Sequence, residues 1–131
     1  ITDTKVPIYA NSLDLGGAFY WWRKGVTINK LVVKESTTYK NAFTDCIALK
    51  NITIEGVIGQ DFDIGDSPLT KDSIESILYH LSSTSTGKTL TLSGSAVRKA
   101  FETIPGDLDG DTTWEWQSHI EAHPNWTISL V

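Results

Sequence analysis

Residues 49–54 read Leu-Lys-Asn-Ile-Thr-Ile and residues 28–33 read Ile-Asn-Lys-Leu-Val-Val, so one apolar spacing recurs after 21 residues. Both stretches end in alternating apolar residues, mostly β-branched, which is typical of a short strand with one buried face. An Ala-Phe pair precedes each stretch, at 18–19 and at 42–43. A period in this range is typical of solenoids, in which short strands from successive coils stack on one another.

Two further strands are predicted at 89–92 and 126–130, because apolar and polar residues alternate in both. We expect the four strands to stack as one parallel ladder over a shared interior layer. That layer would contain Leu31, Val33, Ile52, Ile54, Leu90 and Leu92.

The second half of the chain is more helical. Ile74, Ile77, Leu78 and Leu81 follow helical spacing after Thr70, a residue type favoured at helix N-caps. A second helix is predicted over 95–104, before Pro105-Gly106, and a third from Thr112 to the residues before Pro124. The predicted order after residue 67 is therefore helix, strand, helix, helix, strand.

Residues 41–54 resemble one repeat of the BspA-like leucine-rich-repeat family, whose repeats have the form A-F-x-x-C-x-x-L-x-x-I-x-I. The matching residues are Ala42, Phe43, Cys46, Leu49, Ile52 and Ile54. The remainder from Ile64 onward resembles the C-terminal segment that follows such repeats in proteins of gut bacteria and their prophages, through the stretches 68–74, 87–92 and 125–131. The resemblance implies a recognition module at a cell surface or on a virion, with no catalytic residues.

The expected architecture is an α/β fold: a short leucine-rich-repeat solenoid with a parallel ladder of short strands and a helix-rich C-terminal cap. The 131 residues would form one domain, with degenerate repeats in 1–66 and the capping part in 67–131. Because methionine is absent, even at the first position, we expect upstream repeats in a longer parent chain.

Composition argues against nucleic-acid binding and against membrane insertion. The net charge is −5 and the basic residues are scattered, whereas a nucleic-acid surface needs a basic stripe to offset phosphate charge. No apolar run approaches the roughly 18 residues that a membrane-spanning helix requires. We therefore expect neither nucleic-acid binding nor membrane insertion.

Three groups of residues are candidate metal-binding or catalytic sites. Asp107, Asp109 and Asp111 alternate as Ca²⁺ ligands can, but the EF-hand positions of glycine and of the final acid are not met, which favours an acidic turn. Asp61, Asp63 and Asp66 could supply paired carboxylates for glycan hydrolysis, although turn acids are common. His80, His119 and His123 are the third group, as candidate zinc ligands. His119 and His123 are four residues apart, as zinc ligands on one helix can be, but the spacing places no third ligand beside them.

Cys46 is the only cysteine, and its apolar surroundings predict a buried packing residue more than a nucleophile. Tyr20, Trp21, Trp22 and Arg23 belong to an aromatic run that cannot all face one core. They are the predicted binding residues, and the alternative is that the aromatic rings cover the N-terminal edge or pack on an upstream repeat. The expected function is non-catalytic recognition of a protein or glycan ligand, without a cofactor. The alternatives are a small glycan hydrolase that uses the acidic clusters and a calcium-stabilised adhesion module.

Overall fold

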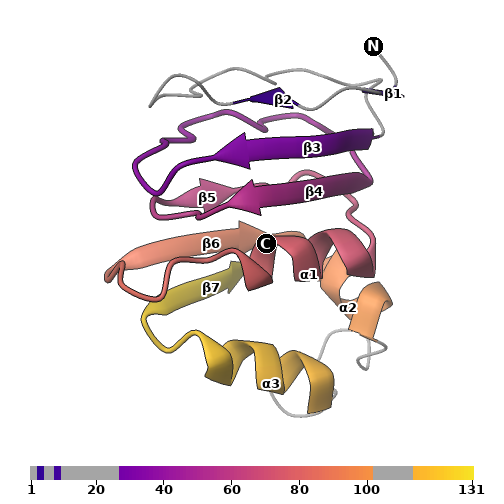
Figure 1. Ribbon diagram of the computed structural model, residues 1–131. Helices are drawn as coiled ribbons and strands as arrows, with labels where there is room; N and C mark the ends of the chain where they lie inside the picture. The colour runs from indigo at the N-terminus through magenta and orange to yellow at the C-terminus, as the bar shows by residue number, and fades with distance from the viewer. Residues whose placement is uncertain (1–2, 5–7, 10–26, 102–113) are drawn as a thin grey trace.

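The computed structural model describes residues 3–4, 8–9, 27–101 and 114–131, and it is a mixed α/β structure with parallel strands and, in this part of the chain, three helices (Figure 1). The elements, in chain order, are β1 (Asp3–Thr4), β2 (Ile8–Tyr9), β3 (Thr27–Val33), β4 (Asn51–Gly56), β5 (Phe62–Asp63), α1 (Lys71–Tyr79), β6 (Lys88–Leu92), α2 (Gly94–Phe101), α3 (Trp114–Ala122) and β7 (Trp126–Leu130). The predicted order of helix, strand, helix, helix, strand in the second half is confirmed.

The first sheet is built on β3, which pairs with β1 and β2 along one edge and with β4 along the other, always in parallel. The register of β3 against β4 differs from the shift of 21 residues that the sequence pattern suggests. Leu31 lies opposite Ile54 and not opposite Ile52, which instead pairs with Ile28. The 21-residue shift does not describe the strand pairing, because Leu49 does not belong to the strand. Its N–H closes a turn onto the carbonyl of Cys46.

An irregularity in β3 allows this register. Ile28 and Leu31 are three positions apart, so a regular strand would place them on opposite faces. The register shifts between these two residues, which absorbs the odd position, and both side chains are completely buried. The strand therefore contributes Ile28, Leu31 and Val33 to the same core.

The second sheet has the order β5-β6-β7, again parallel, with Phe62 opposite Leu90 and Leu90 opposite Ile128. The prediction of one ladder of four strands is therefore wrong, since β3 and β4 lie in one sheet and β6 and β7 in another. In Figure 1 the arrows of the two sheets run in opposite directions. The reason lies at the edge of β4, where α1 packs and occupies the place that a further strand would need.

Hydroxyl groups of α1 satisfy the edge of β4. The backbone N–H groups of Ile52 and Ile54 donate hydrogen bonds of 2.9 Å to the hydroxyls of Ser73 and Ser76. Beyond the helix, Ile58 and Leu81 form a parallel bridge that joins the two halves of the chain. An unpaired strand edge is a template for further pairing, and the serines remove that template here.

A single core lies between these elements. All six residues predicted for the interior layer are buried in one continuous cluster, although they come from two sheets. Ile74, Ile77 and Leu78 of α1, Val97 and Phe101 of α2, and Trp116 of α3 join the same cluster.

The predicted start of the first helix is confirmed, but α1 ends at Tyr79 and Leu81, which was counted in its helical spacing, forms a bridge instead. Thr70 is the N-cap of α1, but its hydroxyl contacts Ser73 and Asn51 side chains and makes no capping bond. At α2, the Ser93 hydroxyl accepts a hydrogen bond from the N–H of Ala96. The predicted end of the second helix at 104 and the predicted N-cap Thr112 lie outside the described residues.

Candidate functional site

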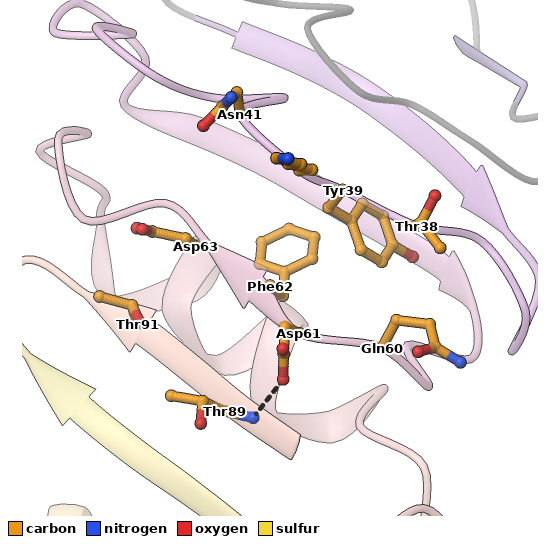
Figure 2. Close-up of a pocket in the computed structure, with 10 residues that line it drawn as sticks. Thr38, Tyr39, Asn41, Gln60, Asp61, Phe62, Asp63, Thr89 and Thr91 are labelled. Carbon is orange, nitrogen blue, oxygen red and sulfur yellow. Dashed lines mark hydrogen bonds between the residues drawn. The ribbon is translucent and has the colours of Figure 1, made fainter.

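A groove of about 490 Å³ lies where the segment after β3 passes beside β5 and β6 (Figure 2). Its walls come from three stretches that are well separated in sequence and that the parallel pairing brings together. The lining residues are Thr38, Tyr39, Lys40, Asn41, Gln60, Asp61, Phe62, Asp63, Thr89 and Thr91.

Two aromatic rings form the base of the groove. Tyr39 meets Phe62 edge-on with ring centroids 4.7 Å apart, and Phe43 lies 5.2 Å from Phe62 on the other side. Phe62 is completely buried and Tyr39 is only 2% exposed. The rings therefore stabilise the walls by packing, and no open aromatic face is presented to a ligand.

The Tyr39 hydroxyl is the one buried side-chain polar atom without a hydrogen-bond partner in the described part of the chain. Burial raises the pKa of this hydroxyl well above its ordinary value of about 10, because ionisation would place a charge in an apolar environment. In Figure 2 the hydroxyl end of the ring is directed to the side of the groove where Thr38 and Gln60 lie. A buried unpaired hydroxyl is costly, and such groups are rare.

Two members of the predicted acidic cluster, Asp61 and Asp63, line this groove, and all three carboxylates have backbone partners. Asp61 accepts a hydrogen bond of 2.9 Å from the N–H of Thr89, which fixes β5 beside β6. Asp63 accepts one of 3.0 Å from the N–H of Gly65. Asp66 accepts one of 3.0 Å from the N–H of Asp45, in the preceding turn. Each acid thus stabilises a turn or a strand pairing.

Other polar groups around the groove have unused bonding capacity. The side chains of Lys40, Asn41, Gln60 and Thr91 make no hydrogen bond with the described residues. Asn41 has a φ of 57°, a left-handed conformation that asparagine tolerates better than most residues. Donors and acceptors of several kinds therefore line the groove.

The other sequence-predicted sites fall outside the described residues or do not line this groove. Tyr20, Trp21, Trp22 and Arg23, and likewise Asp107, Asp109 and Asp111, are outside the described residues. Cys46 is completely buried, as predicted, and forms no disulfide.

The three histidines have local roles. His80 bonds the carbonyl of Ser76 in its own helix at 2.6 Å, whereas His119 bonds the Glu75 carboxylate at 3.0 Å. Burial, together with the nearby His119, lowers the pKa of His123. Among the residues that the structure describes, no group of three or more histidine, cysteine, aspartate or glutamate side chains is placed to hold a metal ion.

Sequence reasoning missed the groove itself. The sequence analysis identifies Asp61 and Asp63 as candidate carboxylates. It does not predict Tyr39, Asn41, Gln60 or Thr91 as site residues. The one sequence feature that could have indicated the groove is Tyr39, an aromatic residue that precedes the Ala-Phe pair of its repeat. The contact between the rings of Tyr39 and Phe62 could not be predicted from spacing, because it depends on which segments lie side by side.

No family model, no curated protein and no solved structure matches this chain. No helix in the described ranges has the length and apolar character needed to cross a membrane.

Proposed function

We propose that this chain is a non-catalytic recognition module of the leucine-rich-repeat type, related to the BspA-like proteins, that acts at a bacterial surface or on a virion. Its ligand would be a protein or a glycan. The resemblance of residues 41–54 to one repeat of that family motivates the proposal, and the contacts between successive segments support it.

The observation that carries the proposal is the contact between equivalent positions of neighbouring segments. The Asp66 carboxylate accepts the N–H of Asp45, and the Ser67 hydroxyl donates to the carbonyl of Cys46, both across 21 residues. On the other side of the core, β3 and β4 pair in parallel. Contacts of this kind are expected of the stacked coils of a solenoid, which bury a core that no single coil could bury alone.

The structure favours recognition over hydrolysis at the groove. A hydrolase that uses two carboxylates employs one as an acid and the other as a base or nucleophile. Asp61 and Asp63 are instead each engaged by a backbone N–H, and they stabilise a strand pairing and a turn. Unused donors and acceptors along the groove suit binding.

The proposal is tested by incubating the labelled chain with an array of bacterial and host glycans and an array of extracellular proteins. For any ligand found, the dissociation constant is measured for the native chain and for an Asn41→Ala, Gln60→Ala double variant. Gln117→Ala is the matched control, because Gln117 is exposed on α3 and away from the groove. Trp21→Ala and Trp22→Ala test the aromatic run in parallel.

We expect binding without turnover, weakened by the groove variant or by the tryptophan variants and unaffected by the control. Mass spectrometry of each glycan after incubation reports on hydrolysis. If the native chain releases shortened products and Asp61→Asn or Asp63→Asn does not, the chain is a hydrolase and the recognition proposal is wrong.

A further inference from the structure

The chemistry of the groove narrows the class of ligand, if the proposed recognition function holds. Its accessible groups are hydroxyls, amides, carboxylates and one ammonium, supplied by Thr38, Asn41, Gln60, Asp61, Asp63, Thr89, Thr91 and Lys40. Its volume of about 490 Å³ lies within the range of small-ligand sites. The lining is therefore rich in hydrogen-bonding groups of both senses.

Peptide recognition would require a different surface. Peptides are anchored by large apolar side chains in open pockets, or by pairing with a strand edge. Here Phe62 is completely buried and Tyr39 nearly so, which leaves no apolar cavity for an anchor. The edge strand beside the groove, β5, is only two residues long, which leaves too little backbone for a peptide strand to pair with.

A saccharide fits the same surface better, because each sugar hydroxyl both donates and accepts a hydrogen bond. Amide side chains such as Asn41 and Gln60 offer both roles, and the carboxylates of Asp61 and Asp63 retain lone pairs beyond those used by backbone N–H groups. Two carboxylates against one ammonium disfavour an anionic sugar. The ligand class indicated is a neutral saccharide.

The Tyr39 hydroxyl supplies an independent reason to expect a ligand. It is buried, lacks a partner among the described residues and belongs to a residue that lines the groove. A group in this state gains more from a new hydrogen bond than an exposed hydroxyl does, because it has no bond to water to give up. We propose that the groove binds a neutral saccharide, and that a small side-chain shift on binding brings the Tyr39 hydroxyl, which is closed off in the free chain, into contact with a sugar hydroxyl.

The test is a titration of the ¹⁵N-labelled chain with neutral tetrasaccharides of glucose, galactose, mannose and N-acetylglucosamine, each up to about 10 mM. The amide signals of Thr89 and Gly65 report on the groove, since these N–H groups bond Asp61 and Asp63. At least one tetrasaccharide is expected to shift both signals. Tyr39→Phe is expected to weaken that binding about tenfold, the effect of losing one hydrogen bond.

Tyr79→Phe is the matched control, because Tyr79 is 66% exposed on α1 and does not line the groove. Tyr39→Phe should leave the melting temperature unchanged or raised, since the hydroxyl has no internal partner to lose. A melting temperature lowered in Tyr39→Phe but not in Tyr79→Phe would overturn the inference, as would binding insensitive to Tyr39→Phe.

Failure of all four sugars to shift these amides would also overturn it. The proposed recognition function would survive that result if the chain still bound a protein on the array. Absence of any ligand on either array would instead count against the recognition function itself, so the two failures are distinguishable.

Discussion

The backbone N–H of Ile52 donates a hydrogen bond of 2.9 Å to the hydroxyl of Ser73, so the edge of β4 ends on a helix side chain and not on another strand. The backbone N–H of Ile54, two residues further along the strand, donates in the same way to the hydroxyl of Ser76. Two serine hydroxyls of one helix thus take the place of two backbone carbonyls of a neighbouring strand. This substitution ends the first sheet and directs the later strands into the second.

The double variant Ser73→Ala, Ser76→Ala should therefore be destabilised. Each alanine leaves a strand N–H without its acceptor, which costs about 1–3 kcal/mol when the group is buried. Urea unfolding followed by circular dichroism measures the change. Ser118→Ala, at an exposed position of α3, should change stability by less than about 0.5 kcal/mol. Equal stability of the double variant and the control would show that water satisfies this edge.

Gly56→Ala should be strongly destabilising. Gly56 ends β4 with a φ of 105°, and a Cβ there would collide with the backbone carbonyl oxygen of Val33 on the neighbouring strand. Both the conformation and the space exclude a side chain. Gly87→Ala is the matched control: its φ of 67° is also positive, but nothing lies within 4 Å of the added Cβ. Thermal melts should rank the native chain first, Gly87→Ala second and Gly56→Ala last; a Gly56→Ala chain as stable as Gly87→Ala would contradict the register of β4.

Cys46→Ala should cost about 1–2 kcal/mol, because it removes a small group from a closed core and leaves a cavity. The side chain is completely inaccessible, so a thiol reagent should label the native chain only as fast as the chain opens. Labelling is followed by mass spectrometry with and without urea. Rapid modification without urea would mean that Cys46 is accessible, contrary to this structure.

Stability should fall as the pH rises above about 10, the ordinary pKa of tyrosine. Burial raises the pKa of Tyr39, so above that pH the unfolded chain loses a proton that the folded chain keeps, and deprotonation favours unfolding. The stabilisation is complete below pH 10 and declines between there and the higher pKa of the folded state. Urea midpoints measured from pH 8 to about 11 should decline less in Tyr39→Phe than in Tyr79→Phe, the control; parallel curves would exclude this origin.

A second loss of stability is expected on the acidic side of neutrality. Burial, reinforced by His119, lowers the pKa of His123 below its ordinary value of about 6.5. Between that value and the lower pKa of the folded state, the unfolded chain binds a proton that the folded chain does not, so stability declines as the pH falls. His123→Gln should flatten the decline between about pH 7 and 5. An unchanged slope in that variant would assign the effect to other groups.

Local patterns were sufficient for α1, α2 and α3 and for the longer strands β3, β4, β6 and β7, whereas the two-residue strands β1, β2 and β5 were not predicted. The spacing of Ile74, Ile77 and Leu78 predicted α1, and alternation around Leu90 predicted β6, because side-chain periodicity directly reflects which face is buried. The burial of Cys46 followed from its apolar neighbours in the repeat. The acids Asp61 and Asp63 were also identified by sequence, although their backbone partners were not.

Sequence by itself thus determined which residues of this protein enter the helices, the longer strands and much of the core, since those properties depend on neighbours a few positions away. Only the tertiary structure decided that Leu31 faces Ile54, that β4 and β6 lie in different sheets, and that Tyr39 meets Phe62 at the base of a groove. Each of these depends on which of several compatible apolar segments lies alongside another. That choice is made by the bulge in β3 and by the Ser73 hydroxyl at the edge of β4, because they change which backbone groups are left to pair.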